Sequence, residues 1–215
     1  MKLQQFSDAE KRQLIKGGLD HILVHWASNE DLAKDPKVFI AGEGCYIYDI
    51  NGKRYLDSFS SLVTSICGHD RPEIKDAIVE QMEYLEFFPN YHDTFNVPLI
   101  KLAEKLAKIT PGDLEVCFFV CSGSEANETA IKMARQYLWQ IGQKQRYKVI
   151  ARRKSYHGTT IVASWHTGFP KLWEYMEPGI PGRLFAPDVN CFECALGAEF
   201  SMCNLACLKE LVGCL

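Results

Sequence analysis

The chain has 215 residues and a formal net charge of −3, with 47% hydrophobic and 24% charged residues. These are ordinary values for a globular protein, so they exclude a disordered or collagen-like chain. Without a basic excess, there is no reason to expect nucleic acid as a partner.

Neither a membrane span nor a secretory signal is expected. The uncharged stretch 158–170 is shorter than the roughly 20 apolar residues that cross a bilayer. Residues 1–8 contain no apolar core of a signal peptide. The nine cysteines, an odd number, are therefore expected to be thiols in a reducing, cytoplasmic environment.

Three helices are predicted in the first half, where apolar residues recur at helical spacing. They cover residues 8–27, residues 71–87 and a segment from Pro98 to Thr110. Pro72 suits the first turn of the second helix, because the N–H that it lacks has no partner there.

A hairpin is predicted between the first two helices. Residues 45–50 and 53–57 are strand-like and flank Asn51-Gly52. Asn-Gly suits a type I′ turn, in which both central residues take a positive φ.

The second half alternates strands and helices. Strands are expected at 116–120 and 148–151, helices at about 126–141, 159–166 and 204–212, and a loop at 177–187. This order predicts right-handed βαβ units on a parallel sheet, and hence an α/β fold. Two strands alone do not make a stable doubly wound sheet, so the chain is expected to be part of a domain.

Ser122-Gly123-Ser124 lies between the first of these strands and the following helix. A helix start has unpaired N–H groups and a partial positive charge, and glycine lets the backbone approach a ligand. These properties are typical of a phosphate site. The alternative is a capping box, in which Ser122 and Glu125 satisfy the same N–H groups.

Tyr156 and His157 follow the second strand. Open α/β sheets bind ligands outside the carboxyl ends of their strands. An aromatic ring and an imidazole there suit a flat heteroaromatic ligand that carries a phosphate. The alternative is that Tyr156 packs under a loop and His157 bonds to backbone.

Four cysteines lie close together near the end of the chain: Cys191, Cys194, Cys203 and Cys207. Their C-x2-C and C-x3-C spacing suits a tetrahedral zinc site, and the alternative is ordinary thiols.

The segment 122–128, followed by Tyr156-His157-Gly158-Thr159-Thr160, strongly resembles the class III aminotransferases. These form the omega-aminotransferase group of fold-type I pyridoxal-phosphate enzymes. Residues 42–57 are similar to the opening hairpin of that family, and the resemblance extends from about residue 21 to residue 207. It implies an aspartate-aminotransferase-like α/β fold with an incomplete parallel sheet and flanking helices. Residues 1–65 would belong to the small domain, and residues 66–215 would form the first part of the large domain.

The resemblance also implies which residues form the site. The positions for pyridoxal 5′-phosphate are Ser122, Gly123 and Ser124 at the phosphate, and Tyr156 and His157 at the ring. The positions for the substrate pocket, partly across a dimer interface, are Leu62, Val63, Asn90 and Tyr91. No metal ligand is expected, because some family members have a similar cysteine-rich stretch.

The implied reaction moves an amino group from an amine or ω-amino acid to a keto acid such as pyruvate, in a homodimer. The alternatives are an aminomutase of the same family, a non-catalytic fragment, and a zinc-binding interaction module. In the family, the Schiff-base lysine and the Asp that pairs with the ring nitrogen lie beyond the position of residue 215. The chain is therefore expected to be an N-terminal fragment, inactive by itself. Leu62 and Val63 are aliphatic where some amine–pyruvate transaminases carry a Trp, so aliphatic ω-amino donors are expected.

Overall fold

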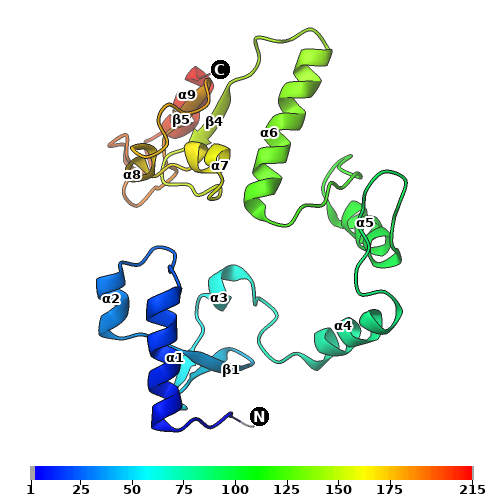
Figure 1. The fold of residues 1–215 in the computed structure, drawn as a ribbon. Coiled ribbons are helices and arrows are strands. Elements are labelled where there is room, and N and C mark those ends of the chain that lie inside the picture. Colours follow the sequence, from blue (N-terminus) through cyan, green and yellow to red (C-terminus); the bar gives the residue numbers. More distant parts are fainter. Residues whose placement is uncertain (1–2, 215) are drawn as a thin grey trace. The chain divides into compact units, whose positions relative to one another are not determined.

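The computed structural model describes residues 3–214 (Figure 1). The chain divides into two compact units, with the boundary in the sequence between Ile100 and Lys101. None of the helices formed by residues 3–214 combines the length and the apolar character that a membrane span requires.

The first unit contains three strands and the first helices of the chain. Its elements are α1 (Asp8–His21), α2 (Asn29–Lys34), β1 (Phe39–Glu43), β2 (Tyr46–Asp49), β3 (Arg54–Leu56), α3 (Ser60–Val63) and α4 (Pro72–Tyr84). The strands form an antiparallel sheet in the order β1-β2-β3. Helix α5 (Val97–Ile109) leads from this unit into the second.

The helix predicted over residues 8–27 is shorter than expected. The Ser7 hydroxyl accepts the Glu10 N–H, and the Glu10 carboxylate accepts the Ser7 N–H, so a capping box starts α1. α1 ends at His21, and Ser28 then caps α2 by accepting the Asp31 N–H at 3.1 Å. α1 thus ends at His21 instead of at residue 27, and α2 begins beyond the predicted range.

The predicted hairpin is confirmed, but its turn differs. Gly52 N–H donates to the Asp49 carbonyl at 2.8 Å, and Asp49 N–H donates to the Lys53 carbonyl at 3.0 Å. Gly52 has a φ of +77°, whereas Asn51 is not among the residues of positive φ. The connection is thus a three-residue loop with glycine in the left-handed position, not a type I′ turn. Asp49 favours it, because its carboxylate accepts the N–H groups of Asn51 and Lys53.

The second unit contains a parallel βαβ arrangement. Its elements are α6 (Gly123–Gln140), β4 (Val149–Arg152), α7 (Ile161–His166), α8 (Pro170–Trp173), β5 (Arg183–Ala186) and α9 (Ala206–Gly213). β4 and β5 pair in parallel, with Val149 opposite Arg183, and α7 and α8 lie in the connection between them. The predicted parallel sheet is confirmed with β4 as one of its strands, but the partner of β4 is β5 and not the predicted strand 116–120.

Two of the predicted elements in this half are wrong. Residues 116–120 form no strand, and Val116 is 96% exposed. A strand needs a hydrogen-bonded neighbour, and none of the strands within residues 3–214 pairs with this segment. Conversely, β5 lies inside the predicted loop 177–187. The Pro and Gly residues that suggested a loop lie on either side of β5 and do not interrupt it.

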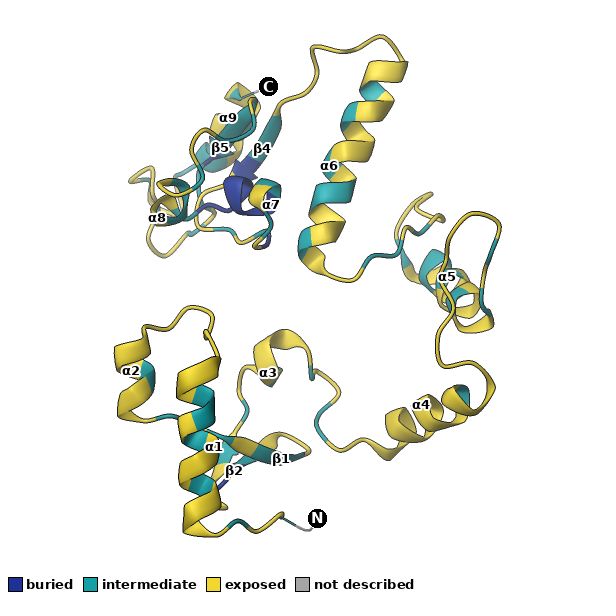
Figure 2. Cartoon of the chain, in the orientation of Figure 1, coloured by how far each residue is buried: buried dark blue, intermediate teal, exposed yellow. Residues whose placement is uncertain are grey.

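The core of the second unit lies between its sheet and α7 (Figure 2). Ala151 of β4, Ala186 of β5 and Trp165 of α7 are buried. In contrast, none of the described residues of α4, α5 and α6 is buried, so their predicted inward faces are exposed or only half-buried. The packed part of this unit is therefore the part that supports the loop after β4.

Candidate functional site

The start of α6 combines a helix cap with free hydrogen-bond donors. The Ser122 hydroxyl accepts the Glu125 N–H at 3.2 Å, as the predicted capping box requires. The Glu125 carboxylate accepts the Cys121 N–H at 2.8 Å instead of the Ser122 N–H, so only half of the box forms.

At least four donors at this helix start have no partner among the described residues. Among residues 3–214, the N–H groups of Gly123 and Ser124 donate to no acceptor. The hydroxyls of Ser122 and Ser124 each accept one bond and donate none to a described residue. A methyl group on Gly123 would meet nothing within 4 Å, so there is open space beside these donors. Four donors at a positive helix end with room beside them fit a phosphate group.

The loop after β4 is joined to α6. Thr159 N–H donates to Ser124 Oγ at 3.0 Å, and Asn127 Nδ2 donates to the His157 carbonyl at 2.8 Å. A Cβ on Gly158 would lie 2.9 Å from Ser124 Cα and closer still to its Oγ. Only glycine therefore lets the two segments meet. The fold brings together the two motifs that the sequence predicted as cofactor-binding.

The His157 ring has a defined hydrogen-bond partner. Its Nε2 lies 3.0 Å from Ser155 Oγ, and that hydroxyl donates to the Arg152 carbonyl at 2.5 Å. A hydroxyl has one proton, so Nε2 is assigned as the donor to Ser155. The ring thus bonds to a side chain, not to backbone as the alternative expectation had it. The main-chain N–H of His157 donates to Thr167 Oγ1 at 3.0 Å, which anchors the loop to the core.

Behind the loop lies a buried imidazole that the sequence did not single out. His166 is 3% exposed, and its Nδ1 donates to the Val162 carbonyl at 2.8 Å. Its Nε2 is buried and has no partner among the described residues. Burial lowers the pKa of His166, and the bond to Val162 opposes this only in part. No sequence signal marks this residue, because its burial depends on how α7 packs.

The residues expected at the substrate pocket lie in the first unit. Leu62 and Val63 belong to α3 and are 72% and 65% exposed. Asn90 and Tyr91 lie in the loop between α4 and α5, and Tyr91 is 70% exposed. All four side chains are therefore available for contacts.

The α3 segment has an unusual backbone. Its residues 60, 61, 62 and 63 take φ values of +47°, +47°, +64° and +65°, and none of them is glycine. This left-handed conformation costs about 1–2 kcal/mol per residue, so it needs support from its surroundings.

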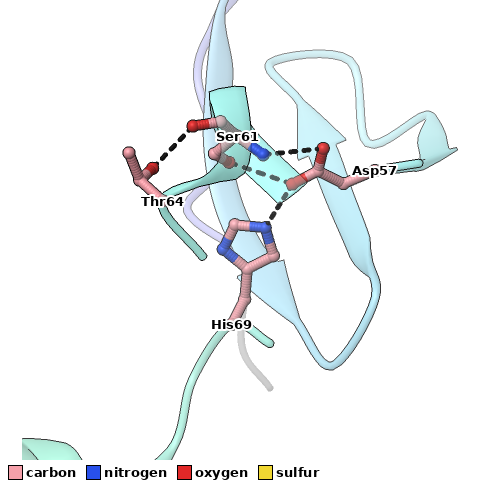
Figure 3. Close-up of polar contacts among 4 residues, drawn as sticks. All are labelled: Asp57, Ser61, Thr64 and His69. Carbon is pink, nitrogen blue, oxygen red and sulfur yellow. Dashed lines mark hydrogen bonds and ion pairs between the residues drawn. The ribbon is translucent and has the colours of Figure 1, made fainter. Parts of the chain in front are cut away.

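Asp57 provides part of that support (Figure 3). Its carboxylate accepts the Ser61 N–H at 3.0 Å, the Ser61 hydroxyl at 2.9 Å and His69 Nε2 at 2.8 Å. The bond from the Ser61 N–H, with the bond from His69, lowers the pKa of Asp57 to about 2. The carboxylate is therefore ionised and acts only as an acceptor at neutral pH.

The described residues contain no set of ligands for the zinc site that was considered for the four cysteines. Cys191, Cys194, Cys203 and Cys207 line one small cavity of about 30 Å³. Among residues 3–214, however, no three His, Cys, Asp or Glu side chains are grouped closely enough to hold a metal ion.

The sequence matches the model of a known protein family. Residues 31–203 match the family model described as Aminotransferase class-III. The β-alanine–pyruvate aminotransferase of Pseudomonas aeruginosa is 39% identical over 149 residues, which are 67% of this chain and 33% of that protein. The chain thus spans about a third of the length of this curated relative.

Solved structures agree with this match over most of the chain. An (S)-enantioselective ω-transaminase from Thermomicrobium roseum is 35% identical with a TM-score of 0.88, and the match covers 98% of this chain and 46% of that one. The ω-transaminase of Pseudomonas jessenii in complex with PMP is 29% identical with a TM-score of 0.82, over 86% of this chain and 41% of that one.

Proposed function

The chain belongs to the class III aminotransferases, which are pyridoxal-phosphate-dependent enzymes of fold type I, and on this premise we propose its reaction and its site. The reaction to which this chain is proposed to contribute cofactor-binding residues moves an amino group from an amine or ω-amino acid to a keto acid such as pyruvate. The relative named for β-alanine and pyruvate supports both halves of this proposal.

Ser122, Gly123 and Ser124 bind the phosphate of pyridoxal 5′-phosphate in this proposal. The support is the set of two N–H groups and two hydroxyl protons that no described residue accepts. Charge-assisted bonds of this kind are about twice as strong as neutral ones. When bound, pyridoxal phosphate supplies an electron sink for reactions at the carbon that carries the amino group.

Tyr156 and His157 face the ring of the cofactor in this proposal. Tyr156 is 53% exposed, so it has surface to offer to a flat ring. Because His157 Nε2 holds its proton toward Ser155, the edge of the imidazole with Nδ1 remains for other contacts. The bonds of the His157 main chain to Asn127 and Thr167 fix the position of this loop.

The substrate pocket is proposed to contain Leu62, Val63, Asn90 and Tyr91, whose location is described above. We further propose that residues 1–65 belong to the small domain and residues 66–215 to the large domain of a cytoplasmic homodimer. The aliphatic pair at 62–63 supports an aliphatic ω-amino donor over an arylalkylamine.

The observation that carries the proposal is the junction of α6 with the loop 156–159, with four free donors beside it. The test is equilibrium dialysis of the chain against pyridoxal phosphate, pyridoxal and inorganic phosphate. The chain should retain pyridoxal phosphate at least about tenfold more tightly than pyridoxal, because charged hydrogen bonds contribute about 1.5–3 kcal/mol.

Matched serine variants assign the effect to the site. The double variant Ser122→Ala, Ser124→Ala should weaken binding of pyridoxal phosphate by about tenfold or more. Ser7→Ala is the control, because Ser7 also caps a helix and accepts the N–H of a glutamate three residues later. Equal retention of pyridoxal and pyridoxal phosphate, or an equal loss in the control, would contradict the proposal.

A further inference from the structure

One carboxylate supports the turn that presents Leu62 and Val63, in addition to backbone bonds such as that from the Val63 N–H to the Phe59 carbonyl at 2.9 Å. L-residues adopt the left-handed conformation singly as a rule, yet the whole segment 60–63 has it. Asp57 binds both the N–H and the hydroxyl of Ser61, so it fixes the second residue of this turn from two sides (Figure 3). A carboxylate is suited to this task because its two oxygens accept several bonds at once.

Asp57 is itself fixed by His69, and His69 by the sheet. The His69 Nε2 bond orients the carboxylate, and the two side chains are only 19% and 9% exposed for His69 and Asp57. The backbone of His69 exchanges two hydrogen bonds with Gly44, at 2.8 and 3.1 Å. A Cβ on Gly42 of β1 would lie 2.6 Å from His69 Cγ, so the ring lies directly against the strand.

These contacts form a continuous path from β1 to the turn. The backbone of Gly44, directly after β1, positions His69, His69 orients Asp57, and Asp57 holds Ser61. All members of the path belong to the first unit, and neither Leu62 nor Val63 takes part in it. The pair is therefore placed by groups that do not touch it.

We propose that Asp57 is a positioning residue that keeps residues 60–63 left-handed and thereby sets where Leu62 and Val63 project. The inference deepens the proposed function and rests on it, because only that proposal makes the pair part of a substrate pocket. A change from positive to negative φ would turn both side chains to another side of the backbone. Donor preference then depends on Asp57, although this residue contacts no donor.

The test is NMR of the isotope-labelled chain without cofactor or substrate. Backbone carbon shifts and the three-bond coupling between HN and Hα report φ at residues 60–63. In Asp57→Ala, these residues should lose their left-handed values, while the resonances of β1–β3 stay in place. His69→Gln should give a smaller change of the same kind. Asp35→Ala is the matched control, since Asp35 forms an ion pair with the exposed Lys37, and its loss should leave the turn unchanged.

Rescue by glycine separates positioning from general stability. Glycine takes positive φ without the penalty that other residues have. Adding Ser61→Gly to Asp57→Ala should therefore restore positive φ at residue 61, whereas a merely structural defect would not respond.

Three results would overturn the inference. The first is that positive φ values at residues 60–63 persist in Asp57→Ala. The second is that Ser61→Gly, added to Asp57→Ala, fails to restore positive φ. The third is that the sheet and the turn are lost together in both Asp57→Ala and His69→Gln. None of these measurements involves the cofactor. Failure to bind pyridoxal phosphate would thus refute the proposed function and leave the result on the turn standing.

Discussion

Two glycines of the candidate site should respond in opposite ways to the same added methyl group. At Gly158 the new Cβ would lie 2.9 Å from Ser124 Cα, where no side-chain rotation relieves the overlap. Gly158 also has a φ of +133°, which strains any residue with a side chain. Overlap in a packed site costs about 1–3 kcal/mol, and backbone strain costs about the same again. Gly158→Ala should therefore destabilise the second unit by about 2–6 kcal/mol.

Gly123→Ala is the matched control for stability and a test of the site. The methyl group has nothing within 4 Å, and alanine suits a helix at least as well as glycine. The free energy of unfolding of the Gly123→Ala variant should stay within about 1 kcal/mol of that of the unchanged chain. Binding of pyridoxal phosphate should nevertheless fall, because the methyl group occupies the space proposed for the phosphate.

Urea unfolding followed by circular dichroism measures the stability of both variants, and equilibrium dialysis measures their binding of pyridoxal phosphate. Gly158→Ala with an unchanged unfolding midpoint would refute the close contact between the loop and α6. Gly123→Ala with unchanged binding would refute the placement of the phosphate. The two results are independent, so each idea can fail without the other.

Three further outcomes are expected. Since burial lowers the pKa of His166, the folded state resists its protonation, and stability should fall as pH drops below about 6.5. His166→Gln should show a shallower fall in urea midpoint between about pH 7.5 and 5.5, and an equal slope would contradict this assignment. Gly42→Ala should lower the melting temperature because its Cβ would meet the His69 ring at 2.6 Å, whereas Gly17→Ala, in open space within α1, should raise it or leave it unchanged. The 215-residue chain alone should convert no pyruvate to alanine, because none of its lysines has the sequence context of the family's catalytic lysine. A turnover of about 1 s⁻¹ would disprove this.

Local signals in the sequence predicted local structure well. The alternating residues on either side of Gly52 gave the hairpin, and Pro72 marked the first position of α4. Where the prediction needed a partner from elsewhere, it failed. The apolar run 116–120 has the composition of a strand, but a strand exists only when another one pairs with it.

At the candidate site too, local motifs could be predicted from the sequence and contacts between distant residues could not. The motifs around Gly123 and His157 were visible in the sequence, because their residue types and order resemble a known family. The bond from Asn127 to the His157 carbonyl joins positions 30 residues apart, and no spacing rule reports it. The left-handed segment 60–63 was also missed, since no glycine or asparagine there signals a positive φ.

The bond between Thr159 and Ser124 has a consequence for synthesis of the chain. The two residues are 35 positions apart, so at about 5–20 residues per second the ribosome adds Thr159 roughly 2–7 s after Ser124. Throughout that interval the first turn of α6 has only local bonds, among them those from the Glu125 N–H to the Ser122 hydroxyl and from the Cys121 N–H to the Glu125 carboxylate. Ser122, which is proposed to bind phosphate in the folded protein, thus first caps the start of a helix on the nascent chain.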